Sequence, residues 1–463
     1  MPVILLGNRQ DACIETMGSS SQGEESIVAY EIDEKPPLGE SIPLGVQHVL
    51  AMFLGNVAPP LIIAGALGLA TGTTSFLVQM ALFVAGVATI VQAYPIGPVG
   101  ARLPIVMGTS FAFLGPLIGI GSDYGLATVF GACLVGASVE IGLGAGLRKR
   151  FKKIFPPIVS GIVVMLIGLT LIPVGMDYVA GGVGAANYGY PINLGLAGLV
   201  FLISLVLNQY FDGILRYASI LIGIVVGYIV AIPLGMVDFS AIEQASWFAI
   251  PIPLKFGINF KIGPIITLAF LYVITTMETI GDITGTTSAV GREPDDRELS
   301  GGLIADGVMS SFGAIFNALP NTSFSQNVGL INFTGVASRF AAAIGGVFLV
   351  GLGLIPKIGA IVAEMPDAVL GGGALIMFGM IFSSGARIII NKVKPGRRNM
   401  VILAVAIGLG LAVELRPDAI ETFFGQLQPT IGPIAQDAQT FFSSGLITGG
   451  FSGLVLSFLL PEG

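Results

Sequence analysis

The chain has few of the residues that build metal sites and disulfide-linked folds. Its 463 residues include two cysteines, one histidine and one tryptophan, and only 11% of residues are charged. Cys13 and Cys133 cannot form a disulfide framework, and they have no metal-ligand spacing. No basic stripe favours nucleic acid as a partner. The sequence therefore predicts no metal site and no nucleic-acid partner.

Apolar residues fill most of the rest of the chain. Hydrophobic residues make up 54% of it and the mean hydropathy is +0.89, which predicts an integral membrane protein with the lipid bilayer as its surroundings. Sixty-six glycines predict closely packed helices, since small residues let membrane helices approach. Residues 1–40 lack the apolar core of a signal peptide. We expect them to form a disordered cytoplasmic tail.

Fourteen segments are candidates for crossing a bilayer, which takes about 17–25 residues for a full helix. Seven precede a more polar stretch at 238–262, and seven follow it. The third and tenth are doubtful because Pro, Gly and polar residues interrupt them. The predicted crossings are 43–66, 75–94, 102–120, 124–146, 155–176, 192–208, 216–237, 263–290, 300–318, 320–335, 337–355, 366–388, 398–414 and 438–460.

Positive charge orients these crossings, because Lys and Arg concentrate in short cytoplasmic loops. One basic cluster, at 148–153, follows the fourth crossing and another, at 392–398, follows the twelfth. Both fall on the inner side if the N- and C-termini are cytoplasmic. An odd number of crossings per half also means that a related second half enters the membrane from the opposite side.

Two short sequence matches support such an inverted repeat. Residues 109–113 (TSFAF) match 322–326 (TSFSQ), and 156–161 (PPIVSG) match 366–371 (PDAVLG) in the same order. Short matches in a Gly-rich apolar chain also arise by chance. Together with the division into seven and seven crossings, they favour the repeat.

Ionisable groups inside predicted crossings are costly and are candidates for function. Glu278 and Asp282 are four residues apart, so they share one helix face, and two such carboxylates do not both ionise readily in a low dielectric. We expect one of them to hold a proton near neutral pH. The alternative is a structural pair satisfied by hydroxyl groups such as those of Thr275, Thr276 or Thr286.

Two further polar residues lie in predicted crossings. His48, which follows Gln47, is the only histidine, and we interpret it as a structural or tuning residue near the site. Asp306 lies in the helix after that of Glu278 and Asp282. A packing hydrogen bond and a proton or ion role are equally good interpretations of Asp306.

Residues 320–339 form a polar, interrupted stretch between apolar segments. Hydrocarbon penalises its unpaired polar groups, so they must face protein or a watery cavity. A helix broken at membrane depth exposes backbone groups to a small polar ligand, and Ser110 and Phe111 of the first half would converge on Phe324, Ser325 and Gln326.

The residue types of this stretch suit a planar heterocycle. The Gln326 amide offers a donor and an acceptor, Glu278 accepts a ring NH group, and phenylalanine supplies a stacking face. These helices carry no inward Arg or Lys, which argues against a sulfate or bicarbonate carrier. A membrane enzyme would need a nucleophile or a metal set, and neither pattern is present.

The run Gln326-Asn327-x-Gly329-x-x-x-x-Thr334-Gly335 resembles the signature of the nucleobase-ascorbate transporter family, also called nucleobase:cation symporter family 2. The likeness extends from Gln47-His48 to the VLGGG segment at 369–373 and leaves out the tail. Many members carry Arg or Lys where this chain has Gly335. That departure bears on selectivity rather than on membership.

The resemblance implies an all-α polytopic membrane fold of about 14 segments in a 7+7 inverted repeat, with short strands in the third and tenth segments. It also implies elevator-type uptake coupled to protons or sodium without another cofactor, a homodimer formed through gate domains, and the cytoplasmic membrane as location. The implied divisions are a tail at 1–40, core parts at 41–146 and 263–355, gate parts at 147–237 and 356–463, and an extracellular loop at 238–262.

The resemblance further implies roles for individual residues. Glu278 and Gln326 would hold the base, helped by backbone groups at Phe111 and Ser325, with Ser110 and Phe324 beside them. Asp282, Asp306, Asn327 and His48 would act in coupling or support the site.

The residue at position 326 also bears on the substrate. Gln326 resembles the xanthine and uric acid branch more than the uracil branch, which carries an acid there, and Ser110 is compatible with uric acid. A uracil permease and a sulfate or bicarbonate carrier on the same fold stay as alternatives.

Overall fold

The computed structural model describes residues 29–146 and 156–461 of the chain. Three sequence predictions concern residues outside these ranges: most of the N-terminal tail, Cys13, and the basic cluster at 148–153. The first half begins with two long helices, continues with a strand and short helices, and ends with four more helices. Its elements are α2 (Leu38–Ala66), α3 (Thr71–Ala93), β1 (Met107–Thr109), the 3-10 helix η1 (Phe111–Phe113), α4 (Leu114–Tyr124), α5 (Leu126–Gly136), α6 (Ser138–Gly146), α8 (Pro157–Val179), α9 (Pro191–Tyr210), α10 (Ile214–Tyr217) and α11 (Ser219–Ala231).

The second half repeats this order after a short connecting helix, α12 (Ser240–Gln244). Two long helices again precede a strand with a short helix, a broken helix and further long helices, which agrees with the predicted repeat. Its elements are α13 (Ile262–Ser288), α14 (Asp296–Ile315), β2 (Asn321–Ser323), α15 (Ser325–Thr334), α16 (Arg339–Gly353), α17 (Pro356–Ala363), α18 (Asp367–Lys392), α19 (Arg397–Leu415), α20 (Pro417–Ile431), α21 (Pro433–Phe442) and α22 (Gly445–Leu459).

Eight of the described helices are long and apolar enough to cross a membrane if α5 and α6 are counted together as Leu126–Gly146. The number is ten if each of two bent helix pairs forms one span. The third and tenth predicted crossings do not pass this test of length, because each consists of a short strand followed by a short helix. The count of 14 segments stays a prediction, whereas the helical membrane fold is confirmed.

The two predicted strands pair with each other in the middle of the molecule. β1 and β2 are antiparallel, with Met107 opposite Ser323 and Thr109 opposite Asn321. Two more backbone hydrogen bonds extend the pairing, from the N–H of Ser110 to the Pro320 carbonyl and from the N–H of Phe324 to the Val106 carbonyl. Each broken segment thus satisfies the other's backbone groups, as membrane depth requires.

Buried side chains of α2 and α3 fix the position of β1. Asn56 Oδ1 accepts hydrogen bonds from the backbone N–H of Thr109 at 2.8 Å and from its hydroxyl at 3.0 Å. The Thr89 hydroxyl accepts from the N–H of Met107 at 3.0 Å. Because Asn56 and Thr89 are fully buried, these bonds hold the strand in a place that water does not reach.

Glycines set the distances between several helices, as the sequence predicts. A Cβ atom on Gly86 of α3 would lie 2.5 Å from the Gly346 carbonyl oxygen of α16, and one on Gly45 of α2 would lie 2.8 Å from the Gly345 nitrogen. Between α8 and α18, a Cβ on Gly168 would lie 2.5 Å from the Phe382 nitrogen. Side chains at these points would push the backbones apart.

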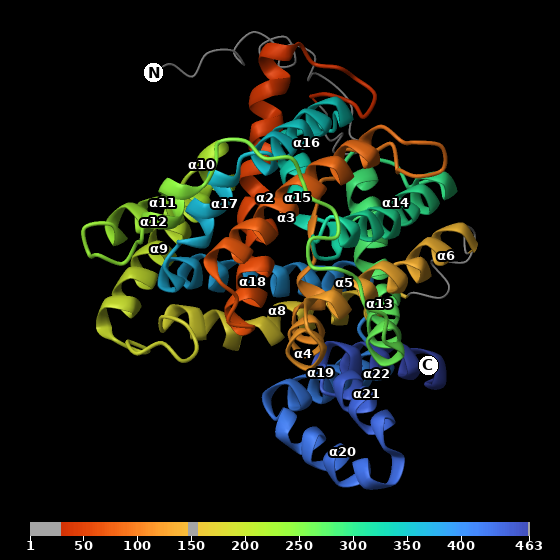
Figure 1. Ribbon diagram of the computed structural model, residues 1–463. Coiled ribbons are helices and arrows are strands. Elements are labelled where there is room, and N and C mark those ends of the chain that lie inside the picture. Colours follow the sequence, from red (N-terminus) through yellow and green to blue (C-terminus); the bar gives the residue numbers. More distant parts are fainter. Residues whose placement is uncertain (1–28, 147–155, 462–463) are drawn as a thin grey trace.

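The helices form two groups with the strand pair in the first. α2–α6 and α13–α17 surround the strands, while α8 and α18 pack closely together and contact α9, α11, α19 and α22. Figure 1 shows α19–α22 together at the lower end of the view, and α19 and α22 pack against α8.

The predicted boundary at residue 355 stays a prediction. It falls where α16 and α17 meet at 81°, and α17 packs against α3 of the strand-containing group. A Cβ atom on Gly359 of α17 would lie 2.6 Å from the Ser75 carbonyl oxygen, which shows how close the two helices are.

The end of the predicted tail is also different in the structure. Residues 29–34 are not disordered, because their backbone bonds the connection between α15 and α16. The N–H groups of Ala337 and Arg339 donate to the carbonyl oxygens of Tyr30 and Ile32. The Arg339 guanidinium forms an ion pair with Asp33 at 2.6 Å, and α2 already begins at Leu38.

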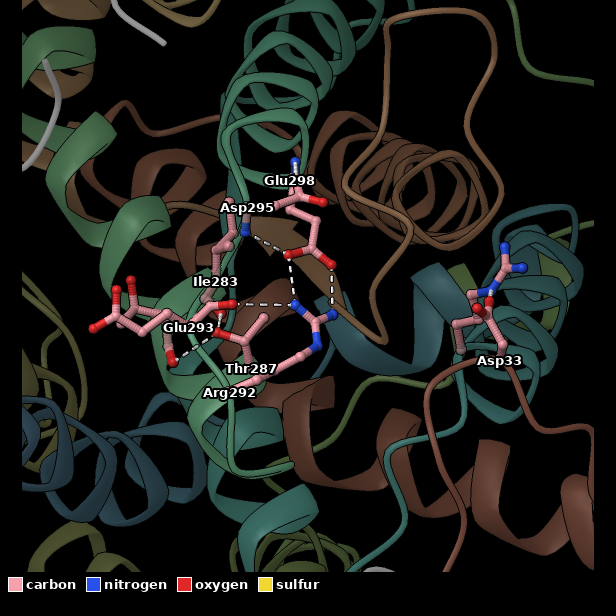
Figure 2. Close-up of polar contacts among 9 residues, drawn as sticks. Asp33, Ile283, Thr287, Arg292, Glu293, Asp295 and Glu298 are labelled. Carbon is pink, nitrogen blue, oxygen red and sulfur yellow. Dashed lines mark hydrogen bonds and ion pairs between the residues drawn. The ribbon is translucent and has the colours of Figure 1, made fainter. Parts of the chain in front are cut away.

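A turn held by side-chain hydrogen bonds joins α13, which carries Glu278 and Asp282, to α14, which carries Asp306. Asp295 and Glu298 form a capping box at the start of α14, and Arg292 binds both oxygens of Glu298, at 2.9 and 2.5 Å (Figure 2). The Glu298 carboxylate raises the pKa of the Arg292 guanidinium, so Arg292 keeps its positive charge at physiological pH.

Candidate functional site

A cavity of about 730 Å³ lies between the strand-containing group of helices and the group built on α8 and α18. Glu278, Thr322, Ser325 and Gln326 come to its wall from the second half, and Thr109 and Phe111 come from the first. The predicted convergence of the two broken segments is therefore present in the structure. The opposite wall consists of residues from the other group: Val164, Ile167, Asn208, Arg216, Tyr217, Ser219, Ile220, Leu221, Met377, Met380, Ile381, Ser384 and Arg387.

Two polar atoms of the residues that line this cavity have no partner among the described residues. Glu278 Oε2 and Thr322 Oγ1 are both buried without a hydrogen bond. An unpaired buried oxygen costs about 1–3 kcal/mol, more if it is charged. A bound polar molecule that donates hydrogen bonds would remove this cost.

Two helix N-termini also reach the cavity. Ser325 and Gln326 begin α15, while Phe111 and Ala112 begin η1 and thereby α4. The first N–H groups of a helix have no acceptor inside it and carry partial positive charge. The wall thus offers backbone donors from both halves, with the half-buried Gln326 amide beside them.

The two predicted aromatic residues differ in how they are placed. The Phe111 ring meets Phe378 of α18 edge to face, with 5.5 Å between ring centroids, so it spans the two helix groups at the cavity. The Phe324 ring packs on Gly55 of α2 and Gly108 of β1, where a Cβ atom would approach it to 2.4 Å. Phe111 is the freer of the two to contact a ligand.

Asp282 lies behind the cavity wall. Its carboxylate accepts hydrogen bonds from the Ser323 hydroxyl at 2.7 Å and the Ser325 hydroxyl at 2.6 Å, and its side chain is 6% exposed. Asp282 therefore ties β2 and the start of α15 to α13. The partners proposed in the structural alternative, Thr275, Thr276 and Thr286, are not its partners.

His48 and Asn327 form a second contact behind the wall. The Asn327 amide nitrogen lies 3.0 Å from His48 Nδ1 and donates to the His48 carbonyl at 3.0 Å. Nδ1 then accepts, and the ring proton lies on Nε2. Both side chains are almost fully buried, and the pair joins α15 to α2.

The structure separates the predicted residues into lining and supporting ones. Five of the six predicted substrate-binding residues line the cavity: Glu278, Gln326, Phe111, Ser325 and Phe324. Ser110 does not. Its hydroxyl caps η1 by accepting from the N–H of Ala112 at 3.3 Å, and the residue is 2% exposed. Asp306 is fully buried and accepts from the Thr279 hydroxyl at 2.5 Å.

Sequence reasoning missed the charged residues of the opposite wall. Arg216 and Arg387 are exposed and line the cavity from α10 and α18. Among the described residues the strand-containing helices contribute no Arg or Lys to the wall, but the cavity as a whole is not free of cationic groups. A single arginine inside the apolar run of α18 was the available signal.

Comparison of the sequence with known proteins identifies the family of this chain. A protein-family model described as Permease family matches residues 39–418. The chain is 36% identical to the uric acid transporter UacT of Escherichia coli over 451 residues, which cover 96% of this chain and 91% of that protein. It is also 36% identical to the Escherichia coli xanthine permease XanP, over 95% and 96% of the two chains, and 37% identical to the Bacillus subtilis xanthine permease, over 90% and 93%.

Solved structures show the same fold at low identity. The membrane domain of the cyanobacterial bicarbonate transporter BicA superposes with a TM-score of 0.61 at 16% identity, covering 83% of this chain and 98% of that one. The murine anion transporter Slc26a9 in its inward-facing state gives 0.62 at 13% identity, with 99% and 76% covered.

The matching family and its named relatives are transporters rather than enzymes. The chain therefore belongs to the Permease family, in the xanthine and uric acid permease branch of the nucleobase-ascorbate transporters that its motifs resemble.

Proposed function

We propose that this nucleobase transporter imports a purine base, xanthine or uric acid, into the cytoplasm across the cell membrane. The observation that carries the proposal is the pair of buried, unpaired oxygens, Glu278 Oε2 and Thr322 Oγ1, from residues at the wall of a cavity in a family of purine permeases. A purine carries ring NH donors and carbonyl acceptors around one plane. It can donate to Glu278 while a carbonyl group accepts from the Gln326 amide or a helix N-terminus.

Shape supports a planar ligand at this place. The edge-to-face contact of Phe111 with Phe378 leaves an aromatic surface at the cavity wall. Stacking of a base on an aromatic side chain contributes about 1–3 kcal/mol. Met377, Met380 and Ile381 line the opposite wall and provide apolar contact for the other side of the base.

We further propose symport by an elevator-type movement of the strand-containing group against the other group. The cavity lies at their boundary, and its mouth carries exposed Arg216 and Arg387. Both arginines are cytoplasmic if the termini are, so the cavity would face the cytoplasm. A proton or sodium ion would supply the coupling energy, and the second group would form the homodimer contact.

Uptake into lipid vesicles tests the proposal. Labelled xanthine, urate and uracil are offered under an imposed proton gradient, an imposed sodium gradient, or neither. We expect xanthine or urate to accumulate with one of the gradients. Glu421→Gln and Gln428→Ala, two exposed changes on α20, serve as matched controls for Glu278→Gln and Gln326→Ala. Accumulation that ignores both gradients would contradict the coupling.

An inorganic anion carrier is the second candidate, favoured by Arg216 and Arg387 at the cavity. Sulfate or bicarbonate would meet the carboxyl group of Glu278, which opposes a small anion unless it is protonated. Transport of either anion that persists in Glu278→Gln would favour this candidate over the purine carrier.

A further inference from the structure

Glu140 is a buried acid that the site described above does not use. It lies on α6, is 0% exposed, and its carboxyl group has one contact: Oε1 is 3.5 Å from the Thr276 hydroxyl of α13. Oε2 has no hydrogen-bond partner among the described residues. Glu140 does not line the cavity. A buried acid of this kind in a membrane protein is expected to have a function.

Close packing of α6 on α14 brings Glu140 to the same region as Asp306. A Cβ atom on Gly144 would lie 2.9 Å from the Ile304 nitrogen, and one on Gly307 would lie 2.8 Å from the Ala137 carbonyl oxygen. Ser300 of α14 also donates to the Gly144 carbonyl at 2.7 Å.

α13 connects the two acids. Thr276 contacts Glu140 and Thr279 contacts Asp306, and residues three apart lie on one helix face. Asp306 Oδ1 is the second carboxyl oxygen here that is buried without a partner. Two unpaired acid oxygens are thus buried on one side of α13.

The hydroxyl groups treat the two acids differently. The Thr279 hydroxyl donates a close hydrogen bond to Asp306. The Thr276 hydroxyl donates to the Tyr272 carbonyl at 2.7 Å and lies 3.5 Å from Glu140, so it stabilises a negative charge on Glu140 much less. A proton that the pair shares is therefore better placed on Glu140 than on Asp306.

No basic group of the described residues bonds this pair. The acids near Glu140 are Asp306 and Glu278, and Asp282 is near Asp306. Tyr272 lies near Glu140, Asp306 and Cys133. The hydrogen bonds and ion pairs of the described residues bring no Lys, Arg or His to Glu140 or Asp306. Two unbalanced buried charges cost several kcal/mol each and repel each other, and one bound proton removes one charge and that repulsion.

We propose that Glu140 and Asp306 form a proton-binding pair behind the substrate cavity, with one proton held on Glu140. A hydronium ion gives up its proton, which forms one O–H bond on Glu140, leaves a water molecule and cancels one of the two negative charges. The proton site stands on its own geometry. Its use as the coupling site rests on the proposed symport.

Infrared spectroscopy of the full chain in lipid vesicles tests the site directly. The wild-type spectrum minus that of Glu140→Gln should contain the C=O band of a protonated carboxyl group, moved to lower frequency in D2O. The control Glu421→Gln should keep the band, and Asp306→Asn should keep it because the proton lies on Glu140. A difference spectrum without this band would show that Glu140 is ionised and would overturn the proposal.

A second variant covers the case that Glu140→Gln does not fold. Thr276→Val removes the nearby hydroxyl but leaves the acid, so the carboxyl band should keep its intensity. A folded Thr276→Val protein without the band would contradict a proton held on Glu140. A third measurement compares the unfolding temperature in sodium with that in potassium. If sodium stabilises the wild type more than potassium does, and Glu140→Gln loses this difference, the pair binds a sodium ion and the proton proposal is wrong.

Purine binding on the same samples separates this proposal from the proposed function. We expect Glu140→Gln to bind xanthine or urate as the wild type does, while uptake no longer responds to a proton gradient. A wild type that shows the carboxyl band but binds no purine would contradict the function and leave the proton site standing. Gradient-driven uptake by Glu140→Gln at the wild-type rate would exclude the coupling role.

Discussion

The Ser325 hydroxyl donates a 2.6 Å hydrogen bond to the Asp282 carboxylate and so ties the first residue of α15 to the middle of α13. The other carboxylate oxygen of Asp282 holds Ser323 of β2. Gln326 follows Ser325 directly, and Glu278 lies one helix turn before Asp282. The distance between the two residues proposed to hold the base thus depends on an acid that does not reach the cavity.

Replacing this acid should weaken both the fold and the site. In Asp282→Asn one of the two serine hydroxyls loses its carboxylate acceptor, which costs about 1–3 kcal/mol of stability. Thermal unfolding of the purified protein should show the loss, and purine affinity should fall with it. Asp418→Asn, an exposed change on α20, is the control. Wild-type stability and affinity in Asp282→Asn would contradict the role of Asp282.

Two glycines of α3 test the close helix packing, because only one of them lies against another helix. Gly86→Ala should strongly lower folded yield and thermal stability, because its Cβ atom would lie 2.5 Å from the Gly346 carbonyl oxygen. Gly72→Ala, in the first turn of the same helix, has no atom within 4 Å of the added Cβ and should leave both quantities unchanged. Equal behaviour of the two variants would show that α3 and α16 do not approach as described.

The arginines at the cavity mouth should favour charged substrates. Urate is an anion at neutral pH, whereas xanthine is largely neutral, so Arg387→Gln should lower urate affinity several-fold and change xanthine affinity little. The difference should shrink as salt is added, since both charges are near solvent. Affinities measured at low and high salt provide the check, and an equal loss for both purines would contradict a charge effect.

Much of the site could be predicted from residue spacing. Glu278 and Asp282 are four residues apart in an apolar segment, and the polar interruption at 320–339 required a cavity or protein partners. The strand pairing of 107–109 with 321–323 agrees with the matched TSF segments. These features could be predicted because hydrocarbon penalises polar groups within a short apolar segment, whatever the rest of the fold is.

Other features depend on contacts between distant segments. The Ser110 hydroxyl could bind a ligand or cap a helix, and only the fold shows that it accepts from Ala112. Most residues of α8 and α18 that line the cavity are ordinary apolar residues, so no local pattern marks them. Glu140 differs, because a single acid within the apolar run 124–146 is a local signal of the same kind as Glu278.

The most direct test of the proposed site is purine-induced thermal stabilisation of the wild type, Glu278→Gln and Gln326→Ala, with Glu421→Gln and Gln428→Ala as controls. Xanthine or urate should raise the unfolding temperature of the wild type and both controls, and uracil should not. Loss of a hydrogen bond to a charged group costs about 1.5–3 kcal/mol, so Glu278→Gln should bind about 10- to 150-fold more weakly. Undiminished stabilisation of Glu278→Gln and Gln326→Ala, or a response to uracil alone, would contradict the account.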